Sequence, residues 1–154
     1  MKQLSSDVLI REATTADADR VAVLSTQLGY PADELVMKRR IQSTQQDAQQ
    51  ILFVAETDGI VVGWLQAFLR VLLMHDAEAE VGGIVVDERF RGRGIGRALM
   101  KRAEVWASER KCDSVYLRSN VVRRDAHRFY LNLGYTVVKT QSAFRKVLPQ
   151  NGGL

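Results

Sequence analysis

The stretch from Glu80 to Leu99 constrains the fold more than any other part of the chain. It begins with an apolar, β-branched run, continues as a loop dense in glycine and arginine, and opens directly into a helical pattern. A strand, a glycine loop and a helix in this order expose unpaired backbone N–H groups at the positive end of the helix dipole. Four arginines between positions 89 and 97 add fixed positive charge. The sequence therefore predicts that this stretch binds a phosphate-bearing ligand.

Two common phosphate-binding loops do not fit the stretch. A Walker A loop requires Gly-Lys-Ser or Gly-Lys-Thr, and neither occurs in the chain. A Rossmann turn requires Gly-x-Gly-x-x-Gly, but its last position is Arg97 when the count starts at Gly92 and Leu99 when it starts at Gly94. Neither a P-loop nor a dinucleotide turn is therefore expected.

What remains is the pattern Arg91-x-x-Gly94-x-Gly96, preceded by the strand run Ile84-Val85-Val86. This pattern resembles the acyl-CoA signature of the GNAT N-acetyltransferase superfamily. Further along the chain, Phe129-Tyr130-x-x-x-Gly134-Tyr135 resembles the second landmark of the same family. The resemblance covers residues 8–147 and is closest to the small, bacterial-type members.

The resemblance implies an α/β fold, the GNAT acyl-CoA N-acyltransferase fold, with a mixed central sheet of about seven strands flanked by about four helices. It implies a single domain over residues 1–154, with its core at about 8–148. Hydrophobic patterning and turn residues predict the individual elements. The expected strands are 8–12, 51–56, 60–73, 79–86, 114–119, 135–139 and 143–147, and the expected helices are 14–28, 32–44, 95–111 and 124–133.

Several local signals sharpen this plan. Asp58-Gly59 is typical of a two-residue hairpin turn, and Gly29 is a natural helix stop. Gly82-Gly83 is typical of a bulge or of two closely packed strands. In the second helix, Leu35 and Ile41 are expected to face the core.

The resemblance also implies acetyl-CoA as the co-substrate. The backbone of the glycine loop would wrap the pyrophosphate, and the fourth strand would pair with the pantetheine arm and hold the thioester carbonyl. Asn120, after the fifth strand, matches a position that bonds the cofactor, although it could equally cap the next helix. The expected binding residues are Ile84, Val85, Val86, Arg91, Gly92, Arg93, Gly94, Ile95, Gly96, Arg97 and Asn120.

Two residues are candidates for the chemistry of acyl transfer to an amine. Tyr130 matches the tyrosine that the family places near the CoA sulfur, where a phenol can protonate the leaving thiolate, although an aromatic residue at helical spacing can also be core. Glu80 precedes the ligand strand and is the candidate general base; the alternative is an exposed strand-end glutamate such as Glu78. The acceptor site implied by the family lies near residues 28–30, the turn at 74–78 and the last hairpin, which is expected from strands 135–139 and 143–147.

Composition limits the partners. The formal net charge is +4, which the four loop arginines account for, so the excess is local and does not resemble a nucleic-acid footprint. One cysteine, Cys112, allows no intrachain disulfide, and a cytoplasmic location without a membrane segment is expected. No residues have the spacing of metal ligands. A small-molecule amine is the expected acceptor, and an edge strand near the C-terminus would allow a homodimer.

Three other functions fit parts of these observations. The same fold could serve as a non-catalytic CoA sensor or interaction module. It could also acetylate an amine on a protein or peptide. A regulatory nucleic-acid binder would use the arginines alone, and it would show strongly salt-dependent binding that CoA does not disturb.

Overall fold

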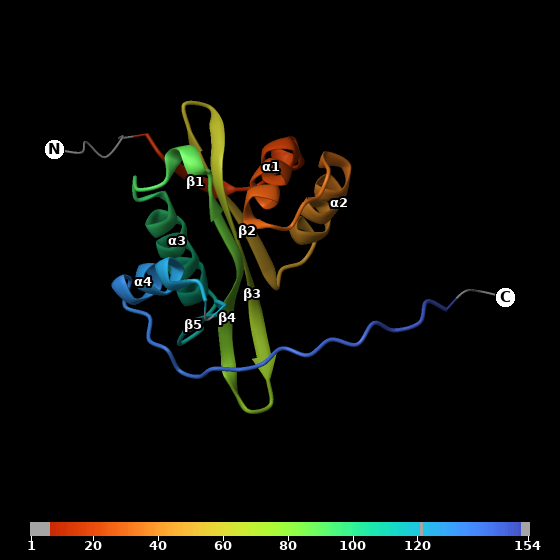
Figure 1. The fold of residues 1–154 in the computed structure, drawn as a ribbon, viewed down its shortest axis with the longest axis vertical. Helices are drawn as coiled ribbons and strands as arrows, with labels where there is room; N and C mark the ends of the chain where they lie inside the picture. The colour runs from red at the N-terminus through yellow and green to blue at the C-terminus, as the bar shows by residue number, and fades with distance from the viewer. Residues whose placement is uncertain (1–6, 121, 152–154) are drawn as a thin grey trace. The chain divides into compact units, whose positions relative to one another are not determined.

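The computed structural model describes residues 7–120 and 122–151. These residues belong to two compact units, Met1–Arg118 and Ser119–Leu154. The first unit contains a five-stranded sheet with the strand order β1-β2-β3-β4-β5 (Figure 1). The second unit contains helix α4. The single domain expected from the sequence stays a prediction.

The sheet is mixed. Strands β1 to β4 pair antiparallel in chain order, and β5 pairs parallel to β4. The strands are β1 (Leu9–Glu12), β2 (Gln50–Thr57), β3 (Ile60–Leu72), β4 (His75–Val86) and β5 (Val115–Leu117). The helices are α1 (Ala18–Leu28), α2 (Glu34–Gln45), α3 (Ile95–Glu109) and α4 (Arg124–Asn132), with short 3-10 turns η1 (Thr15–Asp17) and η2 (Glu88–Phe90).

Helices cover both faces of the sheet in the first unit, with α1 and α2 on one side and α3 on the other (Figure 1). On the α1/α2 face, Trp64 and Val85 join a core with buried residues of both helices, among them Leu24 and Ile41. Each fully buried side chain of this size contributes roughly 1.5–3 kcal/mol. On the other face, Gly63 admits α3 so closely that a Cβ there would lie 3.3 Å from Leu99 Cδ1.

The local turn signals are confirmed. Asp58 and Gly59 have φ values of 52° and 75°, the left-handed pair that a hairpin turn of type I′ requires. Gly29 ends α1 with φ 103°. Gly82 is the extra residue of a bulge, because Gln66 pairs with Gly83 and Ala67 pairs with Val81.

The expected number of strands is wrong. The sheet has five strands, not about seven, and no strand follows β5 in the residues that the structure describes. Valine pairs such as Val137-Val138 are typical of strands, but a strand forms only where a neighbour completes its hydrogen bonds, and both valines are largely exposed. The expected count of about four helices agrees with α1 to α4.

Two smaller expectations also fail. Strand β4 begins at His75 and not at residue 79, because Arg70 pairs opposite Glu78 and holds the β3–β4 hairpin together nearly to its tip. Leu35 does not face the core: it is 78% exposed, while Met37 and Ile41 are buried. No helix in the described ranges is long and apolar enough to cross a bilayer.

Candidate active site

The loop between β4 and α3 leaves its main chain accessible at two glycines and at the start of the helix. Gly92 and Gly94 have φ values of 77° and 80°, a left-handed conformation that favours glycine. A Cβ built on either glycine meets no heavy atom of the described residues within 4 Å. Helix α3 starts at Ile95 with no capping side chain and no acidic residue in its first turn among those residues. Its first N–H groups are therefore open to water or to an anion.

Asp87 fixes the start of this loop. Its buried carboxylate accepts hydrogen bonds from Arg20 Nη2 at 2.8 Å, Arg89 Nη2 at 3.0 Å and the Arg89 backbone N–H at 3.0 Å. The Asp87 N–H donates to the Val62 carbonyl, and Arg20 Nε donates to the Val61 carbonyl. The hydrogen bond from the Arg89 side chain, aided by those from the Arg89 N–H and Arg20, holds the pKa of the Asp87 carboxyl well below its usual range against the effect of burial.

The loop arginines that the sequence singled out lie on the surface. Arg91 Nε donates a long hydrogen bond of 3.4 Å to the Val86 carbonyl, and the Arg93 guanidinium lies 4.9 Å from the Phe90 ring centroid. Arg97 is exposed on the first turn of α3. The structure thus gathers the expected binding residues 91–97 around one exposed turn and helix start.

The end of β4 has an open edge. Pairing with β5 covers Ala79 to Val81 and stops at the Gly82 bulge. Beyond it, the Asp87 N–H donates to the Val62 carbonyl, so the alternation of an antiparallel ladder turns the backbone of Val85 toward β3. The N–H and C=O groups of Ile84 and Val86 then point away from β3, along the same edge of β4 as β5 but beyond the residues that β5 pairs with. An extended amide chain could pair with them there.

Close packing explains Gly83, the second glycine of the pair. A Cβ on Gly83 would lie 3.1 Å from two ring carbons of Trp64. The indole therefore lies against β4 on the α1/α2 face, next to Leu28, whose Cδ2 is 4.0 Å from the same point. Both alternatives for the glycine pair hold, one at each residue: Gly82 is the bulge and Gly83 permits the close approach.

Glu80 lies on the α1/α2 face and is 9% exposed. It pairs opposite Phe68 on β3 and beside Tyr116 on β5. Its Oε1 is 3.7 Å from Arg70 Nε and 3.9 Å from Arg118 Nη2. The buried position distinguishes Glu80 from the exposed strand-end residue that was the alternative.

Glu78 is not the exposed strand-end residue that the sequence suggested. Its carboxylate accepts hydrogen bonds from Arg70 Nη1 at 2.9 Å and from Ser114 Oγ at 3.0 Å. His75 Nε2 lies 3.5 Å from the same carboxylate. These contacts join the β3–β4 hairpin to the residue that precedes β5.

Tyr130 belongs to the second unit. Its ring packs edge-on against Phe129 and Tyr135, with centroid distances of 5.2 and 6.2 Å. Burial raises the pKa of the phenol above its usual 10.0, against a smaller lowering effect of Arg123. The phenol therefore keeps its proton at neutral pH, as a proton donor must.

Asn120 also belongs to the second unit and makes local contacts. Its Oδ1 accepts from the Val122 N–H at 3.2 Å, and its carbonyl accepts from the Arg123 N–H at 2.9 Å. The residue therefore shapes the turn before α4, although Arg123 is the N-cap of that helix. Contact of Asn120 with a cofactor stays a prediction.

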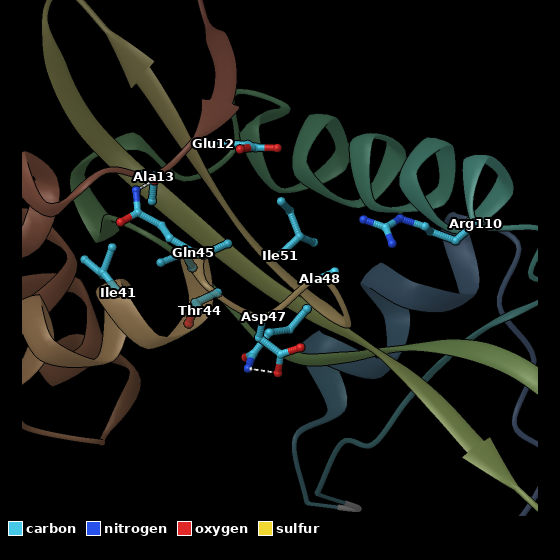
Figure 2. Close-up of a pocket in the computed structure, with 11 residues that line it drawn as sticks. Glu12, Ala13, Ile41, Thr44, Gln45, Asp47, Ala48, Ile51 and Arg110 are labelled. Carbon is cyan, nitrogen blue, oxygen red and sulfur yellow. Dashed lines mark hydrogen bonds between the residues drawn. The ribbon is translucent and has the colours of Figure 1, made fainter.

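A separate hollow of about 160 Å³ lies beside β1, β2 and the end of α2 (Figure 2). Its polar side chains make local bonds. Gln45 Nε2 donates to the Ala13 carbonyl, and Asp47 accepts from the Gln49 N–H and from Gln50 Nε2. The hydrogen bond from the Gln49 N–H is the main reason that the pKa of Asp47 is lowered. This hollow lies where β1, α2 and β2 meet, and none of the glycine-loop residues line it.

Sequence reasoning missed five polar residues of these clusters. The sequence gives one indication of the role of Asp87. It directly follows an apolar strand, and a carboxylate that is buried there needs charged or hydrogen-bonding partners. Its partner Arg20 lies 67 positions away, and no local pattern indicates the pairing. The others are Arg70, Tyr116 and Arg118, which the β3–β4–β5 register brings to Glu80.

Comparison with known proteins gives concordant matches. The model of the Acetyltransferase (GNAT) family matches residues 18–135. An aminoalkylphosphonate N-acetyltransferase from Salmonella typhimurium is 33% identical over 138 residues, which cover 88% of this chain and 87% of that protein. An aminoglycoside N(6')-acetyltransferase type 1 from Stenotrophomonas maltophilia is 28% identical over 150 residues, covering 94% and 97%.

A solved structure shares the fold. Aminoglycoside N-acetyltransferase AAC(6')-Iy in complex with CoA matches with a TM-score of 0.81. The match covers 90% of this chain and 94% of that one at 19% identity. At this identity the likeness concerns the arrangement of helices and strands.

Proposed function

The chain belongs to the acetyltransferase (GNAT) family, as the resemblance predicted, and from this premise we propose that it transfers an acetyl group from acetyl-CoA directly to the primary amine of a small molecule. The observation that carries the proposal is the exposed glycine loop at the start of α3, next to the open edge of β4. One feature suits a pyrophosphate and the other suits the amide chain that follows it in coenzyme A.

The loop has the right donors for the pyrophosphate. The backbone N–H groups from Arg91 to Arg97 line one turn, and the left-handed Gly92 and Gly94 let phosphate oxygens come close to the main chain. Exposed guanidinium groups around the turn add charge without blocking it. The residues present therefore fit the ligand.

The open edge of β4 would hold the pantetheine arm. Ile84 and Val86 offer backbone groups on that side, as a neighbouring strand would need. The alternation favours the N–H of Val86 over that of Val85 as the donor to the thioester carbonyl. Such a donor stabilises the oxyanion of the transition state, and loss of one donor costs on the order of 10²–10³ in rate.

The proton steps use two side chains. Glu80 accepts the proton that the amine loses, directly or through water, as the amine nitrogen bonds to the thioester carbon. The carbon–sulfur bond then breaks, and Tyr130 donates its phenolic proton to the departing thiolate. Solvent restores both groups, and the products are free coenzyme A and an N-acetyl amide. Asn120 would bond the coenzyme.

Relatives support a small acceptor. The names of two similar proteins specify aminoalkylphosphonates and aminoglycosides, which are small molecules with primary amines. Glu80, on the same α1/α2 face of the sheet as Trp64, offers a carboxylate to such an amine. The alternative acceptors, a protein or peptide amine, remain to be tested by the same assay.

The decisive experiment measures thiol release from acetyl-CoA against a panel of small amines and peptides, with acetyl-CoA binding measured by calorimetry. We expect turnover of at least one small amine. In Gly94→Ala, the added Cβ at positive φ should distort the loop and weaken acetyl-CoA binding at least tenfold. Gly59→Ala is the matched control, because it has the same φ sign and open surroundings in a distant hairpin.

Two outcomes would contradict the proposal. Absence of acetyl-CoA binding at millimolar concentration would refute the site. Tight binding without turnover of any amine would favour the CoA sensor. Full activity of Tyr130→Phe would remove that residue from the mechanism without affecting the rest.

A further inference from the structure

A cluster of opposite charges crosses three strands on the α1/α2 face of the first unit. Glu80 on β4 lies between Arg70, which comes from β3, and Arg118, which follows β5. Residues two apart on a strand share a face, so Phe68 opposite Glu80 places Arg70 on this face. The Tyr116 ring lies under both arginines, with Arg70 Cζ at 4.5 Å and Arg118 Cζ at 5.9 Å from its centroid.

The Glu80 side chain is 12% exposed, and its carboxylate makes ion-pair contacts without a close hydrogen bond. Both guanidinium groups lie 3.7–3.9 Å from Oε1, beyond the 2.7–3.2 Å of a hydrogen bond. No residue in the described part of the chain donates a hydrogen bond to this carboxylate. The carboxylate can therefore accept a charge-assisted hydrogen bond from a donor that approaches from solvent.

The two arginines differ in what they have left to bind. Arg70 Nη1 is bonded to Glu78 Oε1 at 2.9 Å, and its side chain is only 15% exposed. The Arg118 side chain is 62% exposed, and it makes no hydrogen bond to any residue that the structure describes. Arg118 therefore keeps its planar set of N–H donors for an anion that approaches from solvent.

We propose that this cluster selects an acceptor whose primary amine lies a few bonds from an anionic group, a phosphonate or a carboxylate; this rests on the proposed function. The ammonium group binds Glu80, and the anion binds Arg118. An ammonium ion alone at Glu80 would lie within a few ångströms of two guanidinium groups and would be repelled by both. A zwitterionic acceptor avoids this cost. Its anion replaces Glu80 as the partner of Arg118, its ammonium group pairs with Glu80, and Arg70 keeps Glu78 as its partner.

The test compares three amines of similar size: 2-aminoethylphosphonate, β-alanine and propylamine. The protein is the full chain with saturating acetyl-CoA, and the readout is thiol release. We expect kcat/KM to be at least tenfold higher for one or both anionic amines than for propylamine. Preference for the phosphonate or for the carboxylate would each support the inference and would identify the anion.

Three variants test whether Arg118 is the cause of the preference for anionic amines. Arg118→Ala should raise KM for the anionic amines by about 10- to 100-fold, the range for loss of a hydrogen bond to a charged group, while kcat changes less than twofold. Arg118→Lys should restore part of the affinity, because it keeps the charge. Arg39→Ala removes one exposed arginine from α2 and should leave all three substrates unaffected.

Two results would overturn this inference and leave the proposed function intact. One is equal kcat/KM for the three amines in the unaltered protein. The other is an Arg118→Ala defect of the same size for propylamine as for the anionic amines, which would indicate a structural role. If no amine is acetylated by a preparation that binds acetyl-CoA, the proposed function fails and the inference fails with it.

Discussion

Substitution of Asp87 by Asn tests whether the buried anchor at the end of β4 stabilises the protein. The side chain of Asp87 is 0% exposed, and its partners Arg20 and Arg89 are 23% and 68% exposed. A hydrogen bond to a charged group contributes about 1.5–3 kcal/mol when it is shielded, which applies to Arg20. The Arg89 pair is exposed to solvent and adds little to this. Because Asn keeps one acceptor oxygen, we expect Asp87→Asn to lower the free energy of unfolding by about 2–4 kcal/mol.

Urea unfolding measures this loss as a shift of the midpoint at constant slope. Asp76→Asn is the matched control, because it removes an exposed carboxylate that lies near a hairpin tip. Combining Asp87→Asn with Arg20→Met in a double-mutant cycle should give a coupling energy above about 1 kcal/mol. If Asp87→Asn behaves like the control, within about 0.5 kcal/mol, then the Arg20–Asp87 pair does not stabilise the fold and the reasoning is refuted.

Three further predictions concern stability. Gly83→Ala places a methyl group 3.1 Å from the Trp64 ring and should lower the free energy of unfolding by about 1–3 kcal/mol in urea titration; an unchanged midpoint would contradict the packing. Leu99→Ala removes a fully buried side chain of α3 and should cost about 3–5 kcal/mol by the same measurement. Folding lowers the pKa values of Asp17 and Asp87 below the usual 3.8, chiefly through hydrogen bonds from arginine. Their contribution is therefore complete above about pH 4 and is lost as the pH falls further, so a stability that stays flat from pH 5 to pH 2.5 would count against both pairs.

The parts of the fold that sequence reasoning placed correctly are those in which the backbone itself demands a residue type. Asp58-Gly59 and Gly29 adopt left-handed conformations, which few residue types other than glycine, asparagine and aspartate adopt without strain. The glycine loop belongs to the same class, because Gly92 and Gly94 are both left-handed. Such demands are local, so they can be recognised in a short stretch of sequence.

The parts that it placed incorrectly depend on distant partners. The segments 135–139 and 143–147 have strand-like composition, but strand formation requires a neighbour that composition does not reveal. Leu35 fits an apolar helix pattern as well as Met37 does, and only the packing of α2 on the sheet decides which of them is buried. The Arg20–Asp87 pair joins α1 to the end of β4 across 67 positions.

The position of Glu80 shows how one irregularity decides the chemistry of a face. In a regular strand, alternate side chains lie on the same face, so Glu80 would share a face with Ile84 and Val86. That is the face of the sheet that α3 covers. The extra residue at Gly82 shifts the alternation by one, so Glu80 lies opposite Phe68 and shares the α1/α2 face with Trp64. The same bulge marks the point where β4 and β5 cease to pair. A regular strand would therefore move the carboxylate to the α3 face, so the position of the proposed base depends on one inserted glycine.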